Sequence, residues 1–237
     1  MKSPEPVSGP LPFANSFIEV PPGGFKMGGS SSDKYVSGVE LPRQDVTFPK
    51  GFAISAAPVT EHEWSLFRSG SGAVGTDSLK PVVNVSLKEI ENYTLWLSES
   101  HPDTRYRLPT ESEWEYACRG GADSLFPWGS GISVNDANYL YDERGTPVGP
   151  GRRTPAGTYP ANGFGLFDML GNVCEWTASA WTASHASNCF DPTRRVIRGG
   201  AWDHLPRILR VSWRDWAPLE ARYDNLGFRL IKETMQS

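Results

Sequence analysis

The sequence predicts a single α+β domain. Three observations support this: three helix starts of the capping-box type, several short extended segments bounded by proline and glycine, and a long region without regular periodicity. The chain has 237 residues, enough to bury a sizeable core in one domain. We expect residues 1–15 to be an N-terminal extension and residues 16–232 to form the domain.

Each predicted helix begins at a hydroxyl residue that is followed three positions later by glutamate. The pairs are Thr60 with Glu63, Ser86 with Glu89, and Thr110 with Glu113, and the helices are expected to reach about Ser69, Ser98 and Gly120. The hydroxyl accepts from the amide three residues on and the glutamate reaches back, so we interpret these glutamates as caps, not catalytic acids. The inward faces are expected to carry Trp64, Phe67, Leu87, Ile90, Tyr93, Leu97, Trp114, Ala117 and Cys118.

Short extended segments make up the rest of the expected regular structure. The expected strands are Phe17–Val20, Gly24–Met27, Asp45–Phe48, Gly51–Ile54, Val196–Arg198 and Gly227–Ile231. From about residue 121 to residue 195, no periodic element exceeds a few residues. So long an irregular region in a compact domain indicates bound ions or side-chain networks that fix its backbone.

Composition and charge exclude several classes of protein. The net charge of −4 gives no general attraction for nucleic acid or for an anionic membrane. No apolar run approaches the roughly 18 residues of a spanning helix, so we expect no membrane insertion. The first ten residues lack the apolar core of a signal peptide. We therefore expect a cytoplasmic protein by default, with phage association or export by another route left open.

The cysteines do not form a recognisable metal or disulfide pattern. Cys118, Cys174 and Cys189 are an odd set without C-x-x-C spacing, and the four histidines are scattered. We expect reduced thiols, with a bridge between Cys174 and Cys189 as the less favoured alternative. Cys118 lies in a helical pattern and is expected in the core.

The C-terminal segment, residues 198–229, combines a frame of glycine, arginine and proline with chemically unrelated filler residues. Seven basic side chains stand between Arg198 and Lys232, against four acidic ones. Arginines at such intervals suggest guanidinium groups that pin an irregular backbone through several carbonyls. The pattern leaves two readings open: a binding surface on a fixed frame, or an irregular structural loop.

Several runs, in this order along the chain, resemble the formylglycine-generating enzyme (sulfatase-modifying factor) family. They are Pro21-Pro-Gly-Gly-Phe-Lys-Met-Gly28, Pro58-Val-Thr60, Pro81-Val-Val-Asn-Val-Ser86, Tyr106-Arg-Leu-Pro-Thr-Glu111, Glu113-Trp-Glu-Tyr-Ala117, Phe126-Pro-Trp-Gly129, Asn162-Gly-Phe-Gly-Leu-Phe-Asp168, Gly171-Asn-Val-Cys-Glu-Trp-Thr177, Arg198-Gly-Gly200 and Gly227-Phe-Arg229. The resemblance covers about residues 16–232. It implies a C-type-lectin-related α+β fold that is rich in irregular structure and usually stabilised by calcium.

The resemblance also implies a structural calcium site. Asp168, Gly171, Val173 and Glu175 match one of the family's sites, with two carboxylates and the carbonyls of Gly171 and Val173 as hard oxygen ligands. The alternative is that the two carboxylates only cap the turn. Asn138 resembles a ligand of the family's second site, but the sequence that follows departs from the family pattern.

The family's enzymes need two cysteines after the Gly-Gly pair, and here those positions hold His204 and Leu209. An imidazole and an isobutyl group cannot replace a thiolate pair that binds copper. We therefore expect no copper and no formylglycine-generating activity. The serine that usually follows Gly-Gly is Ala201.

Three interpretations of this replacement compete. The segment resembles the variable protein of a diversity-generating retroelement, which displays a hypervariable ligand-binding surface at its C-terminus; the alternatives are an oxidoreductase of this family with unknown substrate and a structural paralogue. The expected ligand-binding positions are Asp203, His204, Leu205, Ile208, Val211, Trp213, Asp215, Ala217, Leu219, Ala221 and Tyr223. Asn225 would be a position left unchanged. We favour a non-enzymatic module that binds a protein or other surface ligand through residues 202–224, because aromatics and arginines concentrate there as in interface hot spots.

Overall fold

The computed structural model describes residues 16–73 and 75–235 and confirms the α+β class. The α-helices are α1 Glu61–Ser69, α2 Leu87–Glu99 and α3 Glu111–Arg119. The strands are β1 Phe17–Val20, β2 Gly23–Met27, β3 Gln44–Phe48, β4 Phe52–Ser55, β5 Thr104–Arg107, β6 Cys174–Trp181, β7 Asp191–Arg198, β8 Arg214–Pro218, β9 Leu226–Gly227 and β10 Ile231–Thr234. Short 3-10 turns occur at η1 Gly38–Glu40, η2 Thr76–Leu79 and η3 Pro206–Ile208.

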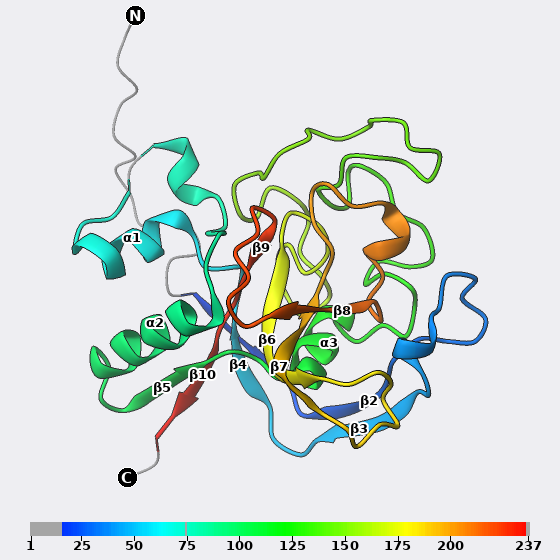
Figure 1. The fold of residues 1–237 in the computed structure, drawn as a ribbon, viewed down its shortest axis with the longest axis horizontal. Helices are drawn as coiled ribbons and strands as arrows, with labels where there is room; N and C mark the ends of the chain where they lie inside the picture. The colour runs from blue at the N-terminus through cyan, green and yellow to red at the C-terminus, as the bar shows by residue number, and fades with distance from the viewer. Residues whose placement is uncertain (1–15, 74, 236–237) are drawn as a thin grey trace, which may run out of the picture.

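The described strands form three sheets (Figure 1). One sheet has the order β1-β4-β10-β5, in which the C-terminal strand lies between β4 and β5. A second contains β2 and β3, and a third has the order β8-β7-β6-β9. In the third sheet β6 pairs in parallel with β9, while the β6–β7 and β7–β8 pairs are antiparallel. Two of these strands, β8 and β9, belong to the C-terminal segment, so that segment supplies both edge strands of this sheet.

The predicted helix starts are confirmed. Thr60, Ser86 and Thr110 are the N-caps of the three helices, and the glutamate three residues later completes each capping box. The glutamates therefore cap, as expected, although Glu113 also binds Arg107 through both carboxylate oxygens. Gly70 and Gly120 end α1 and α3 in the left-handed conformation, which glycine adopts at little steric cost.

Three strands were missed by the sequence reasoning: β5, β6 and β8. The expectation that no periodic element exceeds a few residues between 121 and 195 is wrong for β6, which has eight residues. Its first four residues are buried on both faces, so the strand lacks the alternation that marks a half-exposed strand. The expected strand over 227–231 is instead split into β9 and β10.

Side-chain networks hold the irregular region between α3 and β6, residues 120–173. The amide of Asn162 donates to the carbonyls of Ala117 and Cys118 at the end of α3. Its oxygen accepts from the amides of Phe164 and Leu166, which fixes the following turn. One asparagine thus satisfies backbone groups in both segments, as a buried irregular chain requires.

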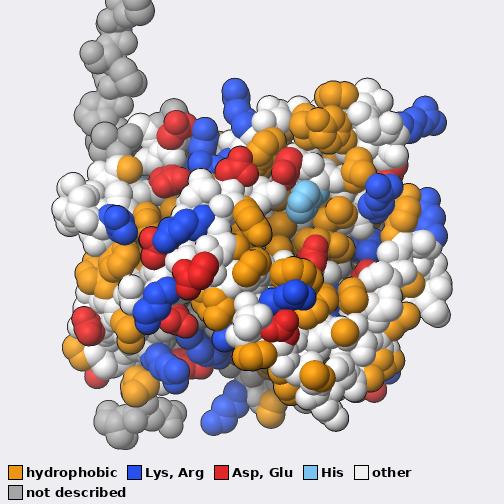
Figure 2. Space-filling model, in the orientation of Figure 1, with side chains coloured by type: hydrophobic (Ala, Val, Ile, Leu, Met, Phe, Trp, Pro, Cys, Tyr) orange, Lys and Arg blue, Asp and Glu red, His pale blue; other side chains and the backbone are white. Residues whose placement is uncertain are grey.

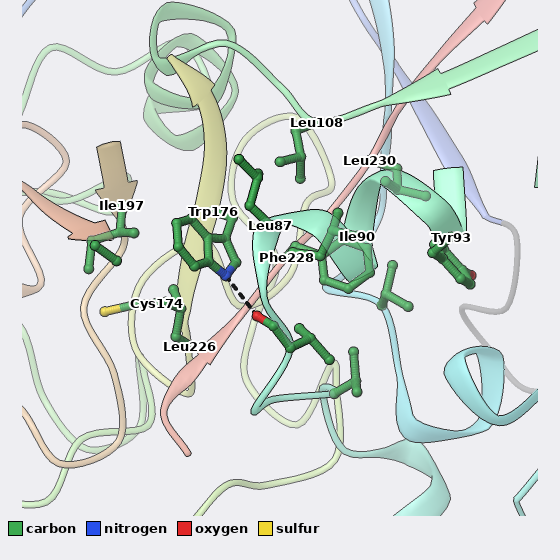
Figure 3. Close-up of a cluster of buried hydrophobic side chains, with 14 of the residues drawn as sticks. Leu87, Ile90, Tyr93, Leu108, Cys174, Trp176, Ile197, Leu226, Phe228 and Leu230 are labelled. Atoms are coloured by element: carbon green, nitrogen blue, oxygen red, sulfur yellow. Dashed lines mark hydrogen bonds between the residues drawn. The ribbon is translucent and has the colours of Figure 1, made fainter. Parts of the chain in front are cut away.

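Buried side chains form two clusters, and the larger one lies between α2 and the β6 sheet (Figure 3). Leu87, Ile90 and Tyr93 of α2 pack there with Trp176 of β6 and Phe228. The Trp176 indole donates to the Val85 carbonyl at 3.2 Å, so its polar group is satisfied inside the core. The second cluster contains Trp114, Cys118 and Leu209.

The three cysteines are free thiols, as expected: Cys118 and Cys174 are buried and Cys189 is exposed. Among the described residues, no helix is long and apolar enough to cross a membrane.

Candidate functional site

The C-terminal segment is anchored by four buried arginines. Arg198, Arg210, Arg214 and Arg229 are each at most 3% exposed. Each donates to at least one backbone carbonyl, so the predicted pinning of an irregular backbone is confirmed. Each also binds a carboxylate, which the sequence reasoning did not foresee.

Arg210 ties the segment to the loop that contains η1. Its Nη1 lies 2.6 Å from Asp33 Oδ2 and 2.7 Å from Glu40 Oε2, and its Nη2 lies 3.1 Å from the Tyr35 carbonyl. Burial acts to raise the pKa of Glu40, but the bonds and charge of Arg210 outweigh it and hold that pKa below its ordinary value. One guanidinium therefore binds two buried carboxylates, from Asp33 and Glu40.

Arg198 and Arg214 bind two glutamates of α3. Arg198 lies 3.0 Å from Glu111 Oε1 and 2.6 Å from Glu115 Oε2, while Arg214 contacts Glu111 through Nε at 2.6 Å and Nη2 at 2.9 Å. The side chain of His185, 4% exposed, approaches Glu111 to 4.0 Å, and neither ring nitrogen has a hydrogen-bond partner among the described residues. Burial lowers the pKa of His185, so its imidazole is neutral at pH 7.

Arg229, at the end of the C-terminal segment, binds Glu175 of β6 and two backbone carbonyls. Its Nε and Nη2 bind the two oxygens of Glu175 at 2.7 and 2.8 Å, and its Nη groups donate to the carbonyls of Ser55 and Phe167. The Trp114 indole donates to the same carboxylate at 2.7 Å. Chain segments far apart in sequence are thereby joined through one ion pair.

Most of the predicted ligand-binding residues reach the surface between these anchors. Asp215 and Tyr223 are exposed, and Asp203, His204, Leu205, Ile208, Trp213 and Leu219 are half-buried. The rings of His204 and Trp213 meet edge to face at 6.0 Å, and the Asn225 amide holds the Asp203 carboxylate at 3.0 Å. Figure 2 shows hydrophobic side chains grouped around the middle of this view, where β6, β8 and β9 lie in Figure 1.

Three predicted ligand-binding residues are wrong. Val211, Ala217 and Ala221 are 2%, 0% and 8% exposed, so a ligand cannot reach their side chains in this conformation. Val211 belongs to the second core cluster, and the two alanines belong to the first. Strand alternation does not separate Ala217 from the exposed Asp215, because residues two apart in β8 lie on the same face; Ala217 is buried by its packing in the first cluster.

The two positions of the family's cysteines differ in environment. Leu209 is fully buried in the core, whereas His204 is half-buried and accepts the Ala201 amide at Nδ1, 3.2 Å away. Cys174 Sγ lies 4.0 Å from the same nitrogen, a proximity that the sequence did not indicate. Burial raises the pKa of Cys174 and lowers that of His204. The pair is therefore a neutral thiol beside a neutral imidazole, not a thiolate.

The sequence matches the family described as the sulfatase-modifying factor enzyme 1-like domain over residues 4–234. The chain belongs to this family. The match extends into the expected N-terminal extension, residues 1–15, which lies outside the described residues.

Known members of the sulfatase-modifying factor family and solved structures are similar over most of the chain. The formylglycine-generating enzyme of Mus musculus is 32% identical over 200 residues, which are 75% of this chain and 52% of that protein. The chain spans about half the length of the curated relatives that it matches first. PvdO from Pseudomonas aeruginosa is 29% identical, with a TM-score of 0.78, over 92% of this chain and 94% of PvdO. Treponema denticola variable protein 1 is 23% identical, with a TM-score of 0.70, over 91% and 94% of the two chains, and shows the same fold.

The family's calcium site is only partly matched by the donor groups here. Asp168 is buried, and this burial, together with the nearby Glu175 charge, raises its pKa to about 6 against the opposing Gly157 amide and Arg229. Such a carboxylate would be stabilised by a cation. Glu175 already accepts three bonds from Arg229 and Trp114, so an ion would have to share it. No group of three His, Cys, Asp or Glu side chains in the described chain could hold a metal. Calcium binding through these two carboxylates and the carbonyls of Gly171 and Val173 stays a prediction.

Asn138, the residue that resembles a ligand of the family's second site, is fully buried. Its amide nitrogen donates to the Arg152 carbonyl and to Asn172 Oδ1, but its Oδ1 has no hydrogen-bond partner among the described residues. An unpaired buried carbonyl oxygen is the kind of group that a cation binds. The second site also stays a prediction.

Proposed function

We propose that this chain is a ligand-binding protein that presents residues 202–224 as a variable surface to a protein or other macromolecular ligand. In this proposal it is the variable protein of a diversity-generating retroelement, and its role is recognition and not catalysis.

One observation carries the proposal: within residues 198–229 the arginines of the frame are buried, whereas most of the filler side chains reach the surface. Arg210 and Arg214 are buried and fixed by carboxylates from elsewhere in the fold, while Ile208 and Tyr223 reach the surface. Because carboxylates and carbonyls of other residues hold these arginines, the fillers can change without loss of the arginine frame. The likeness to variable protein 1 supports the scaffold alone.

A two-library experiment tests the proposal. One library randomises His204, Leu205, Ile208 and Tyr223; the matched control library randomises the buried Val211, Ala217 and Ala221. We expect folded variants and new binders against a panel of purified proteins from the first library only. Single changes of the first set to Ala, Ser or Asp should alter stability by no more than about 0.5 kcal/mol. A first library that yields as few folded variants as the control would overturn the proposal.

The flanking DNA gives an independent test. A variable protein requires a nearby reverse-transcriptase gene and a near-copy of codons 198–229 that differs only at adenines. A complete genomic neighbourhood without either would exclude the retroelement role and leave only the binding role.

An oxidoreductase of unknown substrate is the alternative function. The observation that favours it is the 4.0 Å approach of Cys174 Sγ to His204 Nδ1 at the position of the family's cysteines. The protonation states argue against it, because a buried neutral thiol is a poor nucleophile and metal ligand. A Cys174→Ala variant that keeps ligand binding but loses an oxidation catalysed by the parent protein would favour the enzyme.

A further inference from the structure

A cavity of about 420 Å³ opens beside η3, and neither Cys174 nor His204 lines it. It is enclosed by the loop 32–35, the irregular stretch 125–132 and the turn Pro206–Arg207. In Figure 1 these are the blue loop, a green loop and the orange turn on the right-hand side. Its volume lies within the range of about 300–1,000 Å³ that is typical of small-molecule sites.

Hydrogen bonds fix each of the three walls of this cavity. The loop 32–35 and the stretch 125–132 are bonded to the C-terminal segment, and the turn Pro206–Arg207 is bonded to Glu143. The Arg210 guanidinium binds the Tyr35 carbonyl at 3.1 Å, and the Val211 amide binds the Leu125 carbonyl at 3.0 Å. The Arg207 amide binds Glu143 at 2.7 Å. Because these bonds join groups of the chain itself, they order the walls independently of a bound molecule, which lowers the entropic cost of binding.

The lining combines an apolar interior with one charged side chain that forms no ion pair among the described residues. Leu125, Phe126 and Ile132 supply the apolar wall. Among the charged lining residues, Arg210 binds both Asp33 and Glu40, and Arg207 faces Glu143 at 3.5 Å.

Lys34 is the remaining charge of the lining. It is exposed, lies 4.6 Å from the Tyr35 ring centroid, and has no ion pair within the described part of the chain. A ligand with an anionic end could therefore meet an unneutralised ammonium group at the rim while its body enters the apolar interior.

We propose that this cavity binds a small organic anion with an aromatic or branched apolar body and a single carboxylate. The apolar body lies against Phe126 and Ile132, and the carboxylate lies at the rim by Lys34. This site does not depend on the proposed display surface, because the lining residues within 202–224, which are Pro206, Arg207 and Arg210, are not among the predicted ligand-binding positions.

The test compares 2-naphthoate with its neutral counterpart 2-naphthamide, by calorimetry and ligand-observed NMR on the full chain. We expect saturable binding of both probes, with the carboxylate favoured by about fivefold, the scale of one exposed charge pair. Lys34→Gln should remove that preference, whereas Lys88→Gln on the remote α2 should keep it. Ile132→Glu should abolish binding of both probes, whereas Val134→Glu, an exposed site two residues away, should not.

Melting temperatures show whether each variant is folded before its binding is compared. The proposal is overturned if neither probe saturates at millimolar concentration, if both probes bind equally well to the parent protein, or if Ile132→Glu, once shown to be folded, binds like Val134→Glu. Loss of macromolecular binding by filler variants would leave all of these results unchanged.

Discussion

Replacing Arg210 by methionine should destabilise the fold strongly, whereas the same change at Arg207 should not. Arg210 is 3% exposed and binds Asp33 and Glu40, whose side chains are each 1% exposed. Its loss would leave two buried carboxylates without their partner. Arg207 is three residues away, its side chain is 46% exposed, and it faces Glu143 at 3.5 Å.

The expected loss of stability differs between the two variants because the ion pairs of Arg210 are buried and that of Arg207 is exposed. Removing one partner of a buried ion pair costs about 3–5 kcal/mol, whereas an exposed pair contributes about 0–1 kcal/mol. For a chain of this size, about 2–4 °C of melting temperature corresponds to 1 kcal/mol. Arg210→Met should therefore lower the melting temperature by about 6–20 °C, and Arg207→Met by no more than about 4 °C.

Urea denaturation followed by tryptophan fluorescence, together with thermal melts, measures both variants. Adding Glu40→Gln and Asp33→Asn to Arg210→Met should recover part of the lost stability, because neutral amides are less costly to bury than unpaired carboxylates. Equal losses for Arg210→Met and Arg207→Met would refute the reasoning, and so would a triple variant less stable than the single one.

Three further predictions concern ions, activity and pH. If calcium binds at Asp168, a chelator should lower the melting temperature by several degrees, and Asp168→Asn should remove that sensitivity; Glu175→Ala is a poor test, since it also strips Arg229 of its partner. With His204 and Leu209 in place of the cysteines, a sulfatase-motif peptide and copper should give no aldehyde by mass spectrometry above a buffer control. The lowered pKa of His185 means that the unfolded chain binds a proton below about pH 6.5 that the folded chain does not. The free energy of unfolding should therefore fall as pH drops below that value, by up to about 1.4 kcal/mol per pH unit, and His185→Asn should flatten this slope in urea titrations.

Local chemistry was sufficient to predict the helices and the anchoring role of the arginines. A capping box involves residues three positions apart, so Thr60, Ser86 and Thr110 could be identified without knowledge of the fold. The family's motifs indicated the overall fold because they appear in the same order along the chain.

Burial inside the C-terminal segment could not be predicted in the same way. Val211 and Ile208 are both aliphatic, yet Val211 is buried in the second cluster and Ile208 is half-buried outside it. A segment with neither a helical nor a strand period gives no rule for which side chain faces inward.

The sequence by itself determined the helix starts, the arginine frame and the loss of the family's cysteine pair, because each depends on residue identity or short-range spacing. Only the tertiary structure decided which carboxylates neutralise the arginines. Asp33 and Glu40 lie 177 and 170 positions from Arg210, and Glu111 lies 103 positions from Arg214. The same holds for Cys174, which the fold brings within 4.0 Å of His204 across 30 positions. These ion pairs and contacts join residues that are far apart in the sequence. Their spacing along the chain does not predict which of them become neighbours, because the folded sheets and cores decide that.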